Sequence, residues 1–352
     1  MIVSCPGRIE LRDVGRWAAH AEGLGFDTIH VPETIHDPFT VAALIIAHTQ
    51  HIDVRTCMVV AFPRSPMVVA CAAWDLQKFS GGRFELGIAS QVRGNIVGRY
   101  STEWSEPVAR MRDYVASLRA IFHSFQTGAD LHHIGSHYRF DRLQPYFNPG
   151  PIDARMPPIW TGGVNAGMCA LAGEIADGFV CHPTTSHPDA LRALVLPAMA
   201  EGRKRSDRAV IGTRIVAGPQ PITANDEAAL QRARDARRTE LAFLYSTPAY
   251  RPQLELFGLG DLGQQLSEMA RRSDWTHMPS CLTDEVIGQL VPQGTHDVLP
   301  KVLEEWYAGL CHGIVLAAPE PGVEDAAFRE LVARCKLIAP GAGHPDADST
   351  AG

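Results

Sequence analysis

Residues 54–89 read VRTCMVVAFPRSPMVVACAAWDLQKFSGGRFELGIA. Residues 54–61 form an apolar run rich in β-branched side chains, which is typical of a buried strand. Residues 67–79 have apolar positions at helical spacing, and the pair Gly81-Gly82 ends that segment. Residues 84–89 form a second apolar run. A strand, a helix and a second strand in succession predict a βαβ unit, whose two strands must be parallel because a crossover helix joins them.

The same alternation extends in both directions from this stretch. Further strands are expected at 2–4, 28–31, 158–160, 179–181, 210–217 and 313–317. Further helices are expected at 11–24, 39–48, 106–125, 166–176, 188–204, 299–310 and 325–338. About eight such units predict an α/β fold of the closed (β/α)8 TIM-barrel class. An open doubly wound sheet is the rival, and the absence of Gly-x-Gly-x-x-Gly after the first strand weakens it.

Two segments interrupt the alternation. Residues of about 127–157 contain a possible hairpin and many prolines, and residues of about 225–290 look largely helical. We expect both to be insertions in one barrel domain that covers residues 1–338. Residues 339–352 are rich in Gly, Pro, Ala and Asp, and such a composition predicts a flexible tail.

Composition excludes several classes of function. The 352 residues carry a formal net charge of -7, whereas a general nucleic-acid-binding protein shows a basic face. The 8 cysteines include no Cys-x-x-Cys pair, so free buried thiols in a reducing cytoplasm are expected. No basic, apolar leader and no apolar run of about 18 residues is present, so neither a signal peptide nor a membrane span is predicted.

In a parallel barrel the chemistry lies where strands end and the following loops begin. The loop after residues 28–31 brings together Glu33, Thr34, His36 and Asp37. These side chains offer two carboxylates, a hydroxyl and an imidazole at one rim. Asp37 followed by Pro38 is explained equally well as the cap and first residue of the next helix.

Two later loops have the composition of a binding site for a planar ring and a phosphate. Ser90, Gln91 and Asn95 follow the strand at 84–89, where small residues let a ring approach the backbone. The pair Gly162-Gly163 opens a helix, whose free N–H groups suit a phosphate. A Gly-Gly pair is also common in turns, which is the alternative explanation for these two residues.

Five motifs occur in an order that is characteristic of one known family. They are Pro-Glu-Thr-x-His-Asp-Pro-Phe (32–39), Ala-Phe-x-Arg-Ser-Pro (61–66), Ser-x-Gly-Arg-Phe-x-Leu-Gly (80–87), Arg-Met-Arg-Asp-Tyr-Val (110–115) and Ala-Gly-Glu-Ile-Ala-Asp-Gly (172–178). Together they resemble the luciferase-like monooxygenase superfamily, and specifically its branch that depends on coenzyme F420. The resemblance covers most of the chain.

The resemblance implies a bacterial-luciferase-like barrel with insertions, in which the deazaflavin of F420 lies across the carboxyl ends of the strands. It also implies a non-proline cis peptide after the third strand, for which Cys57–Met58 is the best match. The residues that match the family's cofactor contacts are Glu33, Cys57, Met58, Ser90, Gln91, Asn95, Thr161, Gly162, Gly163, Asn165 and Gly178. Family members are often homodimers, so a homodimer is expected.

The implied reaction is hydride transfer between C5 of the deazaflavin and a small organic substrate. Such a transfer needs a proton partner, and Glu33, His36 and His182 are the candidate catalytic residues. Arg64 and Arg93 are candidates for anchoring substrate or phosphate, or are solvated loop residues. The sequence departs from some family members, because Thr34 stands where they have a histidine directly after the acidic residue.

Three alternatives stay open. The same fold can bind FMN and act as a two-component monooxygenase. A metal-dependent barrel hydrolase would use His36, Asp37 and His182 as ligands. A non-catalytic cofactor-binding protein is the third alternative.

Overall fold

The computed structural model describes residues 1–206, 212–319 and 325–341. Contacts within the chain divide it into two compact units. The N-terminal unit comprises residues 2–180 and 198–213, and the C-terminal unit comprises Met1, residues 181–197 and the chain from residue 214 onward. Each unit is described by itself.

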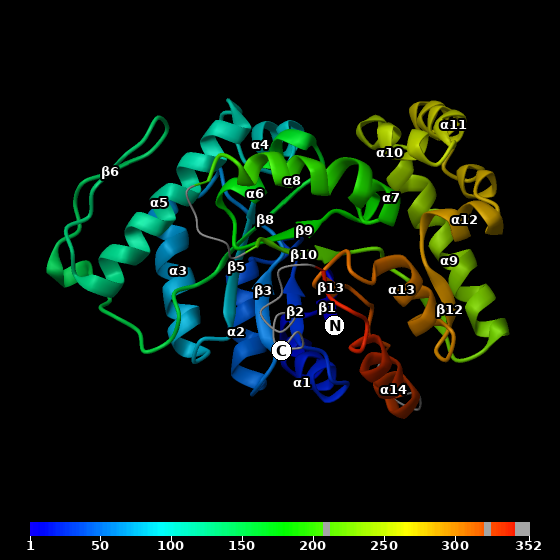
Figure 1. Ribbon diagram of the computed structural model, residues 1–352, viewed down its shortest axis with the longest axis horizontal. Helices are drawn as coiled ribbons and strands as arrows, with labels where there is room; N and C mark the ends of the chain where they lie inside the picture. The colour runs from blue at the N-terminus through cyan, green and yellow to red at the C-terminus, as the bar shows by residue number, and fades with distance from the viewer. Residues whose placement is uncertain (207–211, 320–324, 342–352) are drawn as a thin grey trace. The chain divides into compact units, whose positions relative to one another are not determined.

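The N-terminal unit is built on parallel strands that pair in chain order (Figure 1). They are β1 (Ile2–Ser4), β2 (Thr28–Val31), β3 (Asp53–Thr56), β5 (Phe84–Ala89) and β8 (Ile159–Gly163), with β9 (Gly178–Cys181) ending at the boundary. The register pairs Ile29 with Val54, Val54 with Phe84 and Gly87 with Trp160. The strands are almost entirely buried, although β2 (TIHV), β3 (DVRT) and β5 (FELGIA) include polar residues.

Helices cover these strands and also pack in chain order (Figure 1). They are α1 (Val14–Gly23), α2 (Pro38–His48), α3 (Pro66–Phe79), α5 (Pro107–Thr127) and α6 (Ala166–Ile175), and a single turn of 3₁₀ helix (Leu11–Asp13) precedes α1. Asp37, Ser65 and Asn165 cap α2, α3 and α6 through their side-chain oxygens. Since each cap satisfies an N–H that the helix leaves free, these helices begin where the sequence supplies a cap.

The expected strand at 54–61 is wrong as one continuous element. It divides into β3 and the short β4 (Val59–Val60), and the peptide bond between Cys57 and Met58 that separates them is cis. A short helix, α4 (Arg93–Gly98), was not expected from the sequence. The expected hairpin is confirmed as the antiparallel pair β6 (His133–Ile134) and β7 (Arg139–Phe140).

The hairpin is held to α5 by one buried carboxylate. Asp113 accepts hydrogen bonds from Nε2 of His133 at 2.7 Å and from the backbone N–H groups of His137 and Tyr138 at 2.6 and 3.0 Å. Burial raises the pKa of Asp113, but these hydrogen bonds outweigh burial and leave that pKa below its usual value.

Polar side chains also occupy the interior of the strands. Arg55 donates to Glu85 at 2.7 Å, contacts Nε2 of His30 at 2.8 Å and lies 3.4 Å from the centre of a Trp160 ring. Burial, and then the charge of Arg55, hold the pKa of His30 well below its usual value. A buried ion pair is tolerated only when hydrogen bonds compensate its lost hydration. Glu85 gains a further bond of this kind, because Nη2 of Arg155 lies 3.3 Å from its Oε1.

The C-terminal unit contains the parallel pair β10 (Arg214–Ala217) and β13 (Gly313–Ile314). The strand expected at 210–217 therefore begins later, and residues 210 and 211 lie outside the described residues. The helix expected at 188–204, whose residues are shared between the two units, divides into α7 (Pro188–Ala190), a π-helical turn (Leu191–Val195) and α8 (Leu196–Arg203). Helices α13 (Leu299–Tyr307) and α14 (Asp325–Cys335) are close to their expected positions.

The long segment expected to be helical is confirmed as α9 (Glu227–Tyr245), α10 (Arg251–Leu256), α11 (Gly260–Arg271) and α12 (Asp284–Leu290), which gather together in Figure 1. Leu241, Tyr245, Leu254 and Leu266 are buried in a hydrophobic core of their own. A parallel pair of strands, β11 (Ile222–Ala224) and β12 (Gln293–Thr295), flanks this segment and was not expected.

The remaining short elements are 3₁₀ turns at Pro145–Phe147, Pro183–Thr185, Pro248–Tyr250 and Met278–Cys281. Parallel strands that alternate with helices confirm the expected α/β class of (β/α)8 TIM barrel. Within the described residues, no helix is both long and apolar enough to cross a membrane. The single-domain boundary at residue 338 stays a prediction.

Candidate cofactor site

The loops that follow β2, β3, β5 and β8 meet at one edge of the N-terminal unit. The register pairs Val31 with Thr56 and Ile88 with Thr161, so these parallel strands end at similar heights. Their carboxyl ends therefore bring the β2 loop with Glu33, the Cys57–Met58 peptide and Thr161 to the same edge.

The backbone around the cis peptide is closely packed. Thr56 donates its hydroxyl to the carbonyl of Gly87 at 2.9 Å and accepts the N–H of Gly87 at 2.8 Å. A Cβ atom at Gly87 would lie 1.9 Å from the carbonyl oxygen of Thr56, so only glycine fits there. Burial raises the pKa of the Cys57 thiol to about 12, and this thiol therefore stays protonated at neutral pH.

Glu33 is the centre of a hydrogen-bond cluster. Its side chain is 6% exposed. It accepts the N–H of Val60 at 2.8 Å, Nη1 of Arg64 at 2.9 and 3.0 Å, and the hydroxyl of Tyr100 at 2.8 Å. Arg64 also donates to Asp37 at 3.2 Å. The carboxylate is therefore held by three donor residues, Val60 and Arg64 from one segment and Tyr100 from another.

The other polar residues of the β2 loop make local contacts. His36 lies 3.0 Å, through Nε2, from the backbone carbonyl of Ile9. Because a carbonyl only accepts, Nε2 carries the proton and Nδ1 is the nitrogen left to accept one. Asp37 accepts the N–H groups of Phe39 and Thr40, which confirms it as a helix cap.

The segment after β5 is exposed and turns sharply. Gln91 has a φ of 62°, a left-handed conformation that a side chain disfavours. Ser90 donates its hydroxyl to the carbonyl of Gln91, and Asn95 lies in α4. Arg93 is exposed at the start of α4.

The end of β8 has an unsatisfied polar atom. Thr161 is only 2% exposed, yet its Oγ1 has no hydrogen-bond partner among the residues that the structure describes. The side-chain oxygen of Asn165 accepts the N–H of Met168, which makes Asn165 the cap of α6. A buried hydroxyl without a partner costs about 1–3 kcal/mol, so a bound molecule that reaches Thr161 would remove that cost.

Gly162 and Gly163 end β8, whereas Gly178 is the first residue of β9 and therefore lies at the amino ends of the parallel strands, away from the edge formed by their carboxyl ends. A Cβ at Gly162 would lie 3.4 Å from Cγ of Met58, an ordinary contact, whereas a Cβ at Gly163 would lie 2.6 Å from Cβ of Met168. A Cβ at Gly178 would lie 2.2 Å from the ring of Trp160. Packing of Trp160 therefore accounts for Gly178, and a bare backbone is required where α6 begins.

His182 belongs to the C-terminal unit. Its ring stacks on Tyr250, with centroids 4.9 Å apart, and its Nδ1 contacts Oγ1 of Thr184 at 2.9 Å. Burial lowers the pKa of His182 to about 4. The imidazole is therefore neutral at pH 7, and because Nδ1 also accepts the N–H of Thr184, Nε2 carries the proton.

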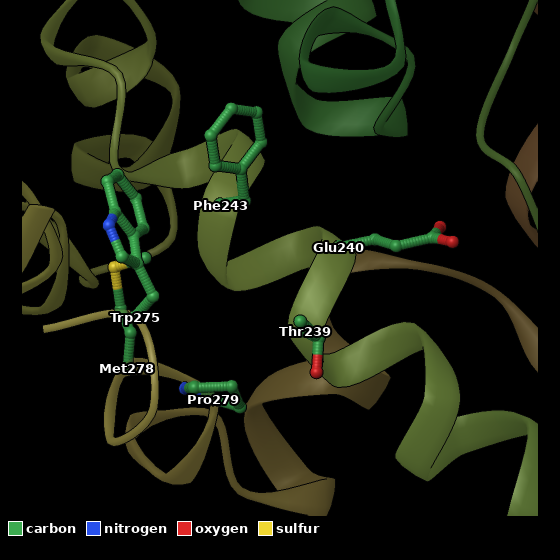
Figure 2. A pocket seen from close by; sticks show the side chains of 6 residues that line it. All are labelled: Thr239, Glu240, Phe243, Trp275, Met278 and Pro279. Carbon is green, nitrogen blue, oxygen red and sulfur yellow. The ribbon is translucent and has the colours of Figure 1, made fainter. Parts of the chain in front are cut away.

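The C-terminal unit also has an apolar pocket of about 420 Å³ between α9 and the segment after α11. Figure 2 shows Thr239, Glu240 and Phe243 projecting from α9, with Trp275, Met278 and Pro279 on the segment that faces it. No motif in the sequence pointed to this pocket. None of the candidate site residues lines it.

The structure brings together most of the expected residues of the N-terminal unit and adds one that sequence reasoning missed, Tyr100. Nothing in the local sequence marks Tyr100, since its link to Glu33 is between residues 67 positions apart. Within the described residues, no group of three or more His, Cys, Asp or Glu is arranged to hold a metal ion.

A barrel with its polar loops at the strand ends defines an enzyme of the (β/α)8 class. The family model for luciferase-like monooxygenase matches residues 2–312, and the chain belongs to that family. Its members are oxidoreductases, and this chain is an oxidoreductase of the same family.

Two mycobacterial relatives are similar to the chain in sequence. An uncharacterized protein of Mycobacterium tuberculosis is 36% identical over 298 residues, which is 85% of this chain and 86% of that protein. A putative coenzyme F420-dependent oxidoreductase of the same organism is 31% identical over 176 residues, 46% of this chain and 48% of its own.

The structural neighbours have low identity and support the fold alone. The coenzyme F420-dependent tetrahydromethanopterin reductase of Methanopyrus kandleri matches with a TM-score of 0.74 and 17% identity, over 96% of this chain and 97% of its own. The oxygenating constituent of 3,6-diketocamphane monooxygenase from Pseudomonas putida, in complex with FMN, matches with a TM-score of 0.66 and 15% identity, over 96% of both chains. Proteins similar to this chain therefore include F420-dependent reductases and an FMN-dependent monooxygenase.

Proposed function

We propose that this protein is an F420-dependent oxidoreductase that transfers a hydride between its cofactor and a small organic substrate. The observation that carries the proposal is the edge formed by the ends of β3, β5 and β8, where a buried hydroxyl lacks a partner and glycines leave the backbone bare. The relative described as a putative F420-dependent oxidoreductase supports the same cofactor.

The residues at this edge suit a cofactor with a flat ring and a phosphate. Met58 would lie beside the ring, and Thr161 would offer its hydroxyl to it. Gly162, Gly163 and Asn165 would hold the phosphate near the start of α6, where N–H groups and the helix dipole favour an anion. When bound, F420 would accept a hydride at C5 of its deazaflavin, and its reduced form would donate one from the same position.

The protein's own residues would position the substrate and supply the proton partner. Glu33, whose carboxylate is held by three donors, would keep the β2 loop in place beside the ring. His36 and His182 remain the proposed proton shuttles. Nδ1 of His36 is left for exchange, whereas Nδ1 of His182 contacts Thr184 and its Nε2 lies 3.4 Å from the hydroxyl of Tyr250, a contact that His182 would have to release. Holding donor and acceptor together can contribute roughly 7–11 kcal/mol toward the barrier.

Direct titration tests the cofactor. We expect the purified protein to bind F420 with a shift in the absorbance of the deazaflavin, and to bind FMN at least about tenfold more weakly. Tight FMN binding without F420 binding would replace this proposal with the two-component monooxygenase, which the FMN complex of the structural neighbour favours.

Three further features complete the proposal. We propose a small-molecule substrate and a homodimer, and light scattering coupled to gel filtration tests the second. We also propose a cytoplasmic location, which the eight free cysteines favour because thiols persist in a reducing compartment. Cell fractionation tests it.

A further inference from the structure

The hydroxyl of Tyr100 links the segment after β5 to Glu33. Tyr100 lies two residues after the end of α4 and donates to Oε1 of Glu33 at 2.8 Å. The backbone N–H groups of Arg99 and Tyr100 both donate to the carbonyl of Asn95, at 2.9 and 3.0 Å. Tyr100 therefore connects two proposed cofactor residues, Glu33 through its side chain and Asn95 through its backbone.

The neighbouring Arg99 strengthens the same connection. Its Nη2 donates to the carbonyl of Thr34 at 2.8 Å, one residue beyond Glu33. Two consecutive side chains thus tie the segment that carries Gln91 and Asn95 to the loop that carries Glu33. The residues of α4 are mostly exposed, so these two hydrogen bonds are the side-chain links by which this segment is tied to the β2 loop.

The electrostatics of the contact agree with its geometry. The pKa of Tyr100 is raised by burial first, then by its hydrogen bond to Glu33 and by the charge of that carboxylate. The phenol therefore keeps its proton across the working range of pH and remains a donor to Glu33. A hydrogen bond to a charged acceptor is about twice as strong as a neutral one.

We propose that Tyr100 is a positioning residue of the cofactor site, which acts through Glu33 to hold the α4 segment and the β2 loop in the arrangement that binds F420. This inference rests on the proposed function. Tyr100 itself carries no chemistry in this view, since its hydroxyl is already committed to the carboxylate.

A double-mutant cycle tests whether Tyr100 acts through Glu33. The dissociation constant of F420 is measured for the wild type, Tyr100→Phe, Glu33→Gln and the double variant. We expect Tyr100→Phe to weaken binding about tenfold in the wild type, as for the loss of a hydrogen bond to a charged group, and less than twofold beside Glu33→Gln. Tyr146→Phe removes the same hydroxyl from an exposed tyrosine and should change nothing.

A second measurement needs no cofactor. Ionisation of tyrosine is followed by ultraviolet absorbance in the apo protein, and the Tyr100→Phe spectrum assigns the signal of Tyr100. Glu33→Gln should lower the pKa of Tyr100, because the carboxylate that raises it is gone. If Glu33→Gln does not fold, Glu33→Asp keeps the charge but withdraws it by one methylene and serves in its place.

The outcomes separate the two proposals. Equal effects of Tyr100→Phe in both backgrounds, or an unchanged pKa of Tyr100 in Glu33→Gln, would overturn the positioning role. If the wild type binds FMN and not F420, the proposed function fails, and the same cycle measured with FMN decides the role of Tyr100.

Discussion

Replacing Thr161 by valine should affect stability and binding in opposite directions. The residue is 2% exposed, and its Oγ1 has no partner among the described residues. Valine has nearly the same shape and no hydroxyl, so Thr161→Val removes an unsatisfied buried polar atom. We expect the free energy of unfolding of the apo protein to rise by about 1 kcal/mol, at the lower end of the cost of such an atom. The same change should weaken F420 binding about fivefold, because the ligand then loses a hydrogen bond.

Thr49→Val is the matched control for this experiment. Thr49 is equally buried, at 2% exposure, but its hydroxyl donates to the carbonyl of Ile45 at 2.8 Å and accepts from Arg83 at 3.2 Å. Thr49→Val should therefore lower the free energy of unfolding by about 1–2 kcal/mol and leave F420 binding unchanged. Urea unfolding measures the first quantity, and absorbance titration measures the second. The reasoning is refuted if Thr161→Val destabilises the apo protein as much as Thr49→Val, or if it binds F420 like the wild type.

Three other predictions follow from the same structure. Gly87→Ala should lower the free energy of unfolding by about 3 kcal/mol or more, because its Cβ would meet the carbonyl of Thr56 at 1.9 Å, and urea unfolding beside the open-sided Gly23→Ala measures this. His182 has a folded-state pKa of about 4, below its usual 6.5, so the free energy of unfolding should rise with pH between those values. His182→Gln should flatten that rise, whereas the same change at the exposed His123 should leave it in place. Asp113→Asn should lower the free energy of unfolding near neutral pH. The loss should shrink as pH falls through the lowered pKa of Asp113, since protonation of the wild-type carboxylate already weakens its bonds to the hairpin. Urea unfolding at several pH values measures this loss, and a loss that does not change with pH would contradict the prediction.

The strands and helices of the barrel could be predicted from the sequence because their signals are local. The run Thr28–Val31 is rich in β-branched residues and fully buried, and Asp37 caps α2 through its own neighbours. The interruption of the third strand could not be predicted from composition, since residues 54–61 are β-branched and apolar throughout. Only the resemblance to the family indicated the cis peptide that divides β3 from β4.

The contacts of the candidate site depend on long-range pairing, so most of them could not be predicted from the sequence. Arg55 and Glu85 lie in buried strands, and each is explained only by the other, 30 positions away. The hydrogen bond between Tyr100 and Glu33 joins residues 67 positions apart, and no motif in the sequence indicates that they are in contact. The roles of the individual site residues stay predictions that the variants above test.

The proton partner can be narrowed by asking which candidate has a free position. Glu33 accepts from Val60, Arg64 and Tyr100, so protonating it would displace a donor that the loops need. His36 commits one ring nitrogen to the protein, through Ile9, whereas His182 has Nδ1 against Thr184 and Nε2 3.4 Å from the hydroxyl of Tyr250. The depressed pKa of His182 makes it neutral at pH 7, where it can donate a hydrogen bond from Nε2 but holds no extra proton to give up. A side chain that polarises a carbonyl by such a bond does not need to be charged, and Glu33 is better suited to hold the loops than to move a proton.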